Sequence, residues 1–258
     1  MIDNPIKAKL RAGEPVVGVF ASIESPTTVE LLGLAGVDFV MLDGEHNPIS
    51  PGEAANMFRA AESVGVPALA RIGENSQQVI AKYMDAGCVG VMTPMVNSRE
   101  DAQRAVDSVK YPPEGRRGLA GVRANRYGLE GPLGEHLARA NEMTLVIPQI
   151  ETLAAVNAAD EIIATEGVDV IFLGPMDLSV ALGVPGQSKH QIVLDMIEAL
   201  TKKIIAAGKV SGTIARNAED YAYWRDRGLG FFLTGANGML ANATSEYMRE
   251  VRAVEEGR

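Results

Sequence analysis

Short apolar segments alternate with amphipathic stretches along the chain, and this alternation predicts the fold. Each apolar segment is bounded by glycine, proline or polar residues, which is typical of a strand buried on both faces. Eight strands are predicted, at residues 16–20, 38–42, 68–70, 88–92, 144–147, 169–173, 210–214 and 229–233. Helical periodicity is clearest between them, at residues 53–64, 76–86, 99–109, 191–207 and 218–227.

Glycines mark several joints between a predicted helix and the next strand. Gly36, Gly87, Gly167 and Gly228 stand at these joints, where a left-handed residue closes a helix. Eight strands alternating with helices, without a low-complexity linker, predict a single (β/α)8 TIM barrel over residues 1–258. An open doubly wound sheet is the alternative, but no glycine fingerprint for a dinucleotide follows the first strand.

Length and composition agree with one large core in a cytoplasmic protein. The chain has 258 residues, of which 47% are hydrophobic, and one domain of this size suits an α/β barrel. The single cysteine, Cys88, excludes a disulfide framework and fits a reducing cytoplasm. We expect no membrane partner, because no segment resembles a signal peptide or a membrane span. The formal net charge of −9 argues against a nucleic-acid partner.

Polar residues at the carboxyl ends of the strands predict an active site, because TIM barrels carry their chemistry at that end. Asp43 and His46 follow the second strand, Arg71 the third, Gln149 and Glu151 the fifth, and Asp177 the sixth. A plainer interpretation makes the carboxylates helix caps or loop residues. An imidazole, a guanidinium and several carboxylates from four strand ends favour the active site.

The carboxylates Glu151 and Asp177 are predicted to bind a divalent cation, Mg²⁺, Mn²⁺ or Co²⁺, through hard oxygen ligands. Such a cation would hold a 2-oxo acid and stabilise the enolate that forms when a carbon–carbon bond breaks, with Arg71 sharing the charge. We expect His46, near Asp43, to carry the proton, because imidazole exchanges protons near neutral pH.

Substrate contacts are predicted from the same strand ends. Gln149 is placed to donate to the substrate oxygens, and the amides around Met176 and Asp177, at a helix start, are placed to bind its carboxylate. A Schiff-base mechanism is disfavoured, because, of the lysines from Lys82 to Lys209, only Lys189 falls in a loop at the predicted barrel mouth.

A long loop precedes the fifth strand and carries four arginines in an otherwise acidic chain, namely Arg116, Arg117, Arg123 and Arg126. A loop of this length in a compact barrel is usually functional or a subunit contact. Two interpretations stay open: a solvated arginine-rich loop, or arginines that face the mouth and bind the distal anion of a substrate.

Several ordered motifs resemble the class II pyruvate aldolases, the HpcH/HpaI aldolases, over nearly the whole chain. The motifs are Leu42-Asp-Gly-Glu-His46, Ala70-Arg71, Gly115-Arg-Arg-Gly118, Arg123-Ala-Asn-Arg-Tyr127, Pro148-Gln-Ile-Glu151 and Gly174-Pro-Met-Asp-Leu-Ser179. That family includes 4-hydroxy-2-oxo-heptane-1,7-dioate and 2-keto-3-deoxy-sugar-acid aldolases. The resemblance implies a barrel of the phosphoenolpyruvate/pyruvate-domain type and metal-dependent, reversible cleavage of a 4-hydroxy-2-oxo acid to pyruvate and an aldehyde.

The resemblance also implies roles for individual residues. It makes His46 the base, Arg71 the transition-state arginine, Glu151 and Asp177 the metal ligands, and Gln149 and the backbone at Met176 substrate contacts. The family usually has alanine where this chain has Met176, so a larger side chain crowds the predicted mouth.

A further carboxylate of the family, the partner of the histidine, matches Asp85. Our predicted topology places Asp85 before the fourth strand, at the opposite end of its own barrel, so a neighbouring subunit is one source of the contact. The resemblance further implies a homo-oligomer, a hexamer built as a dimer of trimers. The apolar face of a C-terminal helix at about residues 238–254 is then expected to pack on a neighbour or on its own barrel.

Two alternatives to the aldolase remain. An oxaloacetate decarboxylase would reach the same enolate by losing carbon dioxide. A non-catalytic barrel that binds oxo acids would bind ligand without turnover, but a mere binder has no need of His46 and Arg71.

Overall fold

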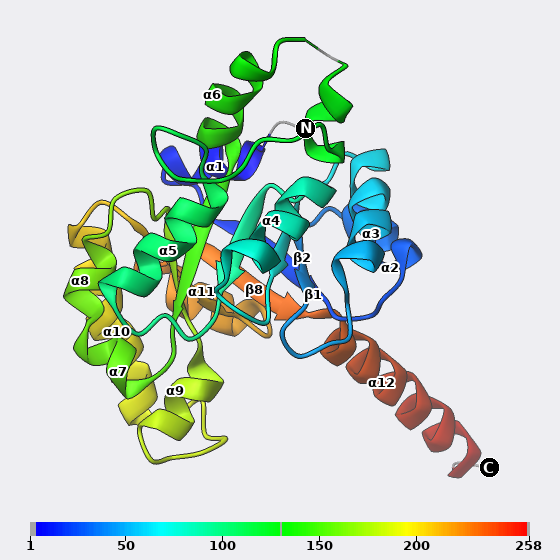
Figure 1. The fold of residues 1–258 in the computed structure, drawn as a ribbon. Helices are drawn as coiled ribbons and strands as arrows, with labels where there is room; N and C mark the ends of the chain where they lie inside the picture. Colours follow the sequence, from blue (N-terminus) through cyan, green and yellow to red (C-terminus); the bar gives the residue numbers. More distant parts are fainter. Residues whose placement is uncertain (1–3, 130, 257–258) are drawn as a thin grey trace.

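The computed structural model describes residues 4–129 and 131–256, in which eight parallel strands close into a barrel (Figure 1). The strands pair in chain order, and β8 pairs with β1 to close the sheet. They are β1 Val16–Ala21, β2 Phe39–Asp43, β3 Ala68–Arg71, β4 Gly90–Thr93, β5 Leu145–Ile150, β6 Val170–Leu173, β7 Val210–Ile214 and β8 Phe231–Gly235. Each overlaps a predicted strand, and the predicted (β/α)8 barrel is confirmed.

Helices surround the barrel and connect successive strands (Figure 1). They are α1 Pro5–Arg11, α2 Pro26–Leu34, α3 Pro51–Ser63, α4 Gln77–Ala86, α5 Arg99–Val109, η1 Arg123–Gly128, α6 Leu133–Met143, α7 Leu153–Asn157, α8 Ala159–Ile163, α9 Pro175–Ala181, α10 Gln191–Ala206, α11 Ala218–Arg225 and α12 Ala236–Glu256. None of these helices, which belong to the described residues, has the length and apolarity needed to cross a membrane. The predicted glycine stops are confirmed; Gly87, for example, has a φ of 116° after α4.

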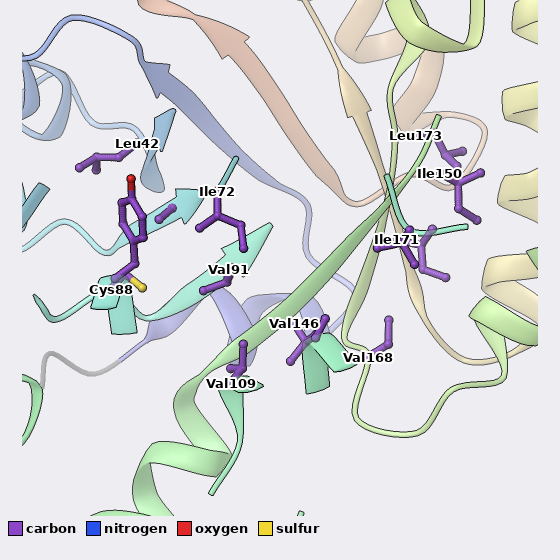
Figure 2. Packing of buried hydrophobic residues seen from close by; sticks show 14 of the residues in the cluster. Leu42, Ile72, Cys88, Val91, Val109, Val146, Ile150, Val168, Ile171 and Leu173 are labelled. Atoms are coloured by element: carbon purple, nitrogen blue, oxygen red, sulfur yellow. The ribbon is translucent and has the colours of Figure 1, made fainter. Parts of the chain in front are cut away.

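Side chains point alternately into the barrel and toward the helices along each strand, and this divides the core into two layers. In β2, Phe39 and Met41 belong to the cluster inside the barrel, whereas Val40 and Leu42 belong to the cluster between strands and helices. Figure 2 shows part of the outer layer, in which Leu42 and residues of other strands meet the helices. The inward positions continue past the apolar core, so that Asp43 follows Met41 on the inner side at the carboxyl end of β2.

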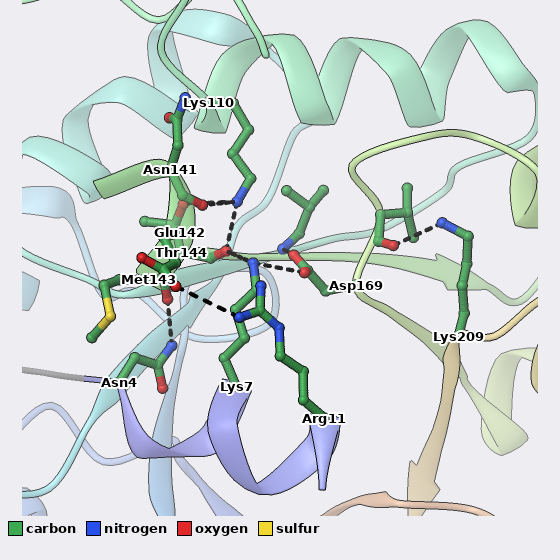
Figure 3. A network of polar contacts seen from close by, with 12 residues as sticks. Asn4, Lys7, Arg11, Lys110, Asn141, Glu142, Met143, Thr144, Asp169 and Lys209 are labelled. Carbon is green, nitrogen blue, oxygen red and sulfur yellow. Dashed lines mark hydrogen bonds and ion pairs between the residues drawn. The ribbon is translucent and has the colours of Figure 1, made fainter. Parts of the chain in front are cut away.

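The amino-terminal end of the barrel is closed by α1 and a buried polar network (Figure 3). Ile6 of α1 is buried in the inner cluster. Lys7 Nζ lies 2.8 Å from Asp169 Oδ1, and Lys110 Nζ donates to the Thr144 carbonyl at 2.7 Å. These charges tie α1 to the loops that precede β5 and β6 (Figure 3). This end is called the base below, and the opposite, carboxyl-terminal end is called the mouth.

Strand β5 extends furthest beyond its predicted end. β5 continues through Pro148 to Ile150, with Pro148 opposite Thr93 of β4 and Gln149 opposite Phe172 of β6. The predicted strand ends at Ile147, before Pro148, and a proline lacks the N–H that a central strand uses. Gln149 is therefore part of the strand, and its side chain occupies an inward position beyond Ile147.

Candidate active site

A buried ion pair between neighbouring strands forms one side of the mouth. Asp43 and Arg71 are the last residues of β2 and β3 and lie in register. Arg71 Nε and Nη2 each lie 2.8 Å from an oxygen of Asp43, a bidentate arrangement that fixes the guanidinium plane. Burial alone would raise the pKa of Asp43, but Arg71 and the backbone amides of His46 and Glu45 together lower it. Asp43 is therefore ionised and anchors Arg71.

Two further side chains complete the surroundings of Arg71. The Phe20 ring, at the end of β1, lies 4.4 Å from the guanidinium carbon and packs against its face. Glu45 Oε2 lies 3.3 Å from Arg71 Nη1. Burial raises the pKa of Glu45, and Asp43 and Asp177 add to the effect while Arg71 opposes it. One guanidinium therefore faces more carboxylates than it can neutralise.

Glu151 lies buried just after β5 and has the most perturbed carboxyl group of the site. Its Oε1 accepts from the Met95 amide at 2.7 Å, and its Oε2 accepts from Gln149 Nε2 at 2.8 Å. Burial raises the pKa of Glu151 to about 7, and the charges of Glu45 and Asp177 add to that rise. A carboxylate held among like charges is typical of a functional site rather than of a stabilising contact.

Asp177 and Met176 lie in the first turn of α9, directly after β6. Both are exposed at the mouth, and Asp177 is close enough to act electrostatically on Glu45 and Glu151. Gly174 allows this approach, because a Cβ there would lie 3.1 Å from Glu151 Oε2. The helix start thus brings its carboxylate and its free amides toward the buried Glu151.

The oxygen atoms of the site fit a divalent cation for which the protein supplies only some of the ligands. Glu151 and Asp177 offer hard carboxylate oxygens, and the buried Oε1 of Gln149 has no hydrogen-bond partner among the described residues. Over residues 4–129 and 131–256, no three His, Cys, Asp or Glu side chains form a complete metal cage. A cation here would therefore take its remaining ligands from water and substrate, as Mg²⁺ commonly does.

His46 lies in the turn after β2 with its side chain 60% exposed. Its ring does not contact the Asp43 carboxylate, which instead accepts from the His46 backbone amide at 3.4 Å. The nearest acidic group to the ring is Glu45, whose Oε2 lies 3.8 Å from Nε2. The residue predicted as the base thus lies beside the site, with Glu45 in the place where we had expected Asp43.

Asp85 is separated from His46 in this chain. It lies at the carboxyl end of α4, where its Oδ1 is 2.6 Å from Arg117 Nη2. No hydrogen bond or ion pair joins it to His46 within the described residues. The sequence-based placement of Asp85 toward the base is thus the observed one, and its predicted catalytic role stays a prediction.

The interpretation in which loop arginines face the mouth of their own barrel is wrong for Arg116, Arg117 and Arg123. Arg117 is buried against Asp85, and Arg123 binds Glu62 Oε2 at 2.6 Å and the Ala86 carbonyl at 2.8 Å, at the carboxyl ends of α3 and α4. Arg116 pairs with Asp107 on α5. The reason is topological, because a segment that leads from a helix into a strand closes at the base.

Three groups of the site were missed by sequence reasoning. Phe20 looked like an ordinary core residue, although its inward position at the end of β1 follows from the strand period. Glu45 lies within the motif Leu42-Asp-Gly-Glu-His46, but nothing in the sequence showed that it would turn toward Arg71. Met95 contributes only its backbone amide and has a φ of 53°, a left-handed conformation that side chains rarely adopt and that often marks functional sites.

Comparisons with known proteins agree with the fold. Residues 16–243 match the family model described as HpcH/HpaI aldolase/citrate lyase. The 5-keto-4-deoxy-D-glucarate aldolase of Shigella boydii is 34% identical over 245 residues, which are 94% of each chain. The chain belongs to the HpcH/HpaI aldolase/citrate lyase family, and it is a lyase of the aldolase class.

Solved structures support the same assignment. A HpcH/HpaI aldolase/citrate lyase family protein from Burkholderia cenocepacia is 31% identical, with a TM-score of 0.90 over 96% of this chain and 99% of that one. The citrate synthase SbnG is also 31% identical, with a TM-score of 0.88 over 97% of this chain and 98% of that one. Barrels similar to this one are therefore named for different carbon–carbon bond reactions.

Proposed function

We propose that this protein cleaves a 4-hydroxy-2-oxo acid reversibly to pyruvate and an aldehyde, with a divalent cation held by Glu151 and Asp177. The observation that carries the proposal is Glu151, a buried carboxyl group with its pKa raised to about 7 among like charges at the barrel mouth. A cation relieves this repulsion, and when bound it supplies Lewis-acid stabilisation of the negative charge that develops on the pyruvate half. The family and the named aldolase relative support the reaction class.

Residues of the chain would transfer the proton, stabilise the developing charge and orient the substrate. A proton leaves the 4-hydroxyl group to His46 Nε2, the bond between C3 and C4 breaks, and its electron pair moves toward the 2-oxo oxygen. Arg71, held by Asp43 and Phe20, is fixed before the reaction and stabilises that oxygen as its charge grows. Return of a proton to C3 completes pyruvate. Gln149 and the amides at the start of α9 orient the substrate carboxylate.

Pyruvate release from a 4-hydroxy-2-oxo acid, before and after treatment with EDTA, tests the proposal. We expect activity to disappear with EDTA and to return with Mn²⁺ or Mg²⁺. Titration calorimetry of Mn²⁺ gives a readout independent of turnover, and Asp177→Asn should weaken Mn²⁺ binding whereas Glu142→Gln, an exposed carboxylate at the base, should not. Full activity in the metal-stripped enzyme would refute the metal-dependent reaction.

The base role of His46 is tested separately. His46→Ala should lower kcat by roughly 10²- to 10⁴-fold, the usual contribution of a positioned general base, and leave pyruvate binding nearly unchanged. Unchanged turnover would remove His46 from the mechanism. Oxaloacetate should be assayed in parallel, because faster decarboxylation than aldol cleavage would favour the decarboxylase alternative.

We also propose that the protein is a homo-oligomer, a hexamer, in which α12 packs on another copy. This helix projects from the barrel (Figure 1), and its apolar side chains Met239, Leu240, Tyr247 and Met248 are all at least 40% exposed. Monomeric proteins rarely expose a continuous apolar face of this kind. Light scattering should give a hexamer for the full chain, and Leu240→Glu with Met248→Glu should dissociate it; a monomeric wild type would refute the proposal.

A further inference from the structure

Glu45 lies between the two groups that are assigned above to opposite ends of the reacting bond. Its Oε2 lies 3.3 Å from Arg71 Nη1 and 3.8 Å from His46 Nε2. Among the described residues, no other carboxylate lies within ion-pair distance of both groups. One oxygen atom therefore faces both the guanidinium assigned to the 2-oxo oxygen and the ring assigned to the 4-hydroxyl group.

The substrate has a carbon atom in the corresponding position. In a 4-hydroxy-2-oxo acid, C3 stands between C2, which carries the oxo oxygen, and C4, which carries the hydroxyl group. A substrate with its oxo oxygen at Arg71 and its hydroxyl group at His46 would therefore present C3 to the space between them. Glu45 Oε2 borders this space. C3 is also the atom that must gain a proton after the bond between C3 and C4 has broken.

The surroundings of Glu45 suit a group that gains and loses a proton. Burial raises the pKa of its carboxyl group, and the charges of Asp43 and Asp177 add to this rise while Arg71 opposes it. A carboxyl group with a raised pKa is a better proton carrier near neutral pH than an ordinary glutamate. The side chain is 17% exposed, so its proton also exchanges with water.

The other carboxylates of the mouth are held in other contacts. Both oxygens of Asp43 lie 2.8 Å from Arg71, and Asn47 Nδ2 donates to Asp43 at 2.6 Å. These donors and the neighbouring backbone amides suit an ionised Asp43, whose pKa is lowered. Glu151 and Asp177 are assigned to the cation. Glu45 is thus the carboxyl group of the mouth that is left for proton transfer.

We propose that Glu45 is a catalytic acid–base group that carries the proton to and from C3. This inference rests on the proposed aldol reaction. After the hydroxyl proton has passed to His46 Nε2 and the bond between C3 and C4 has broken, His46 gives that proton to Glu45 Oε2. Glu45 then gives it to C3, where the electron pair of the enolate forms the new C–H bond. The hydroxyl proton ends on C3, and both residues regain their starting states.

The gap between the two residues is one that substrate binding can close. The side chain of His46 is 60% exposed, so its ring has room to move toward Glu45. Catalytic hydrogen bonds are often long without substrate and tighten only in the complex. A separation of 3.8 Å between Nε2 and Oε2 therefore agrees with proton transfer in the complex.

The test is the exchange of the C3 protons of pyruvate in D₂O, followed by proton NMR with Mg²⁺ and without an aldehyde. Wild type should exchange them, because Glu45 takes a proton from C3 in the reverse direction. Glu45→Gln should slow the exchange by roughly 10²- to 10⁴-fold, the usual contribution of a positioned general acid or base. Calorimetry should show nearly unchanged pyruvate affinity in this variant, since Asp43 still holds Arg71.

A second variant separates the two proton transfers. His46→Ala should lose aldol cleavage and keep most of the exchange, because Glu45 can take up and release protons through water. The matched control is Glu74→Gln, which neutralises an exposed glutamate in the loop after β3. It should change neither the exchange nor the cleavage.

Three results would overturn the role of Glu45 while leaving the aldolase intact. They are exchange at nearly the wild-type rate in Glu45→Gln, slow exchange that a matching loss of pyruvate affinity explains, and equal losses of exchange in Glu45→Gln and His46→Ala. A wild type that cleaves a 4-hydroxy-2-oxo acid without exchanging C3 protons would do the same. A wild type that neither exchanges these protons nor releases pyruvate would overturn the proposed function and this inference with it.

Discussion

The two ends of the barrel both bury charged groups, but these groups have hydrogen-bond partners at the base and like-charged neighbours at the mouth. At the base, Lys110 is 2% exposed and its ammonium group donates to the Asn141 carbonyl at 2.6 Å and the Thr144 carbonyl at 2.7 Å. Lys7 and Asp169 neutralise each other in the same network (Figure 3). At the mouth, Glu45 and Glu151 face like charge, and both have a raised pKa.

This difference separates a structural network from a binding site. At the base, the chain itself supplies hydrogen-bond partners for the buried polar groups, so that end is complete without a ligand. The mouth keeps carboxylates together at a cost in stability, which is typical of sites whose missing partner is a ligand. Substitutions at the base should therefore lower stability and leave activity unchanged. Substitutions at the mouth should lower activity without lowering stability.

The largest expected effect is on activity at the mouth. Glu151→Gln preserves the shape of the side chain and removes its charge, so turnover should fall by about 10²- to 10³-fold, the range for loss of one preorganised electrostatic group. Because a charge buried among like charges is lost, the thermal midpoint of the variant should not fall. Steady-state kinetics and calorimetry check both parts. A variant that keeps its activity would contradict the assignment of the site.

The largest effect on folding is expected at the base. Lys110→Met removes the lysine donor of the Asn141 carbonyl and one of two lysine donors of the Thr144 carbonyl, which Lys7 also binds. The free energy of unfolding should fall by about 2–4 kcal/mol. The kcat per folded molecule should not change. Denaturant unfolding measures the loss, and Lys202→Met, whose side chain is 73% exposed, is the control with almost no effect. An equally stable Lys110→Met variant would show that the network is dispensable.

The same lysine predicts a dependence of stability on pH. Burial lowers the pKa of Lys110 from 10.5 to about 8, although Asp169 opposes the shift. Between these two values the unfolded chain holds more protons than the folded protein, so unfolding becomes less favourable as pH rises. The stability difference between wild type and Lys110→Met should therefore grow from pH 8 to 10.5, by up to about 3 kcal/mol. A difference that stays flat across this range would contradict the lowered pKa.

The smallest effect is expected from a helix cap at the mouth. Ser76 accepts from the Val79 amide and caps α4, shortly after Arg71. Ser76→Ala should lower the free energy of unfolding by about 1 kcal/mol, the usual value of an N-cap, and leave kcat nearly unchanged. Ser63→Ala is the control, because Ser63 is the last residue of α3 and does not cap the amino-terminal end of a helix. A loss of activity larger than the loss of stability would mean that the cap also positions the site.

Much of the fold followed from local pattern. Apolar runs bounded by glycine, proline or polar residues predicted every strand, because strand period and glycine conformation depend on a few neighbouring residues. The rule that chemistry lies at the carboxyl ends of barrel strands then selected Asp43, Arg71, Glu151 and Asp177, which the structure brings to one mouth. The extension of β5 through Pro148 was not predicted, because pairing with both neighbouring strands outweighs the missing N–H of a proline.

The sequence alone determined the order of the strands, their inward and outward positions, and which polar residues stand at their ends, since these depend on contacts close along the chain. Tertiary structure alone decided which groups touch. It placed Phe20 under Arg71, turned Glu45 rather than Asp43 toward the ring of His46, and put the arginine loop at the base. The physical reason is that contacts between loops, and the burial that shifts a pKa, depend on segments far apart in sequence that only the closed barrel brings together.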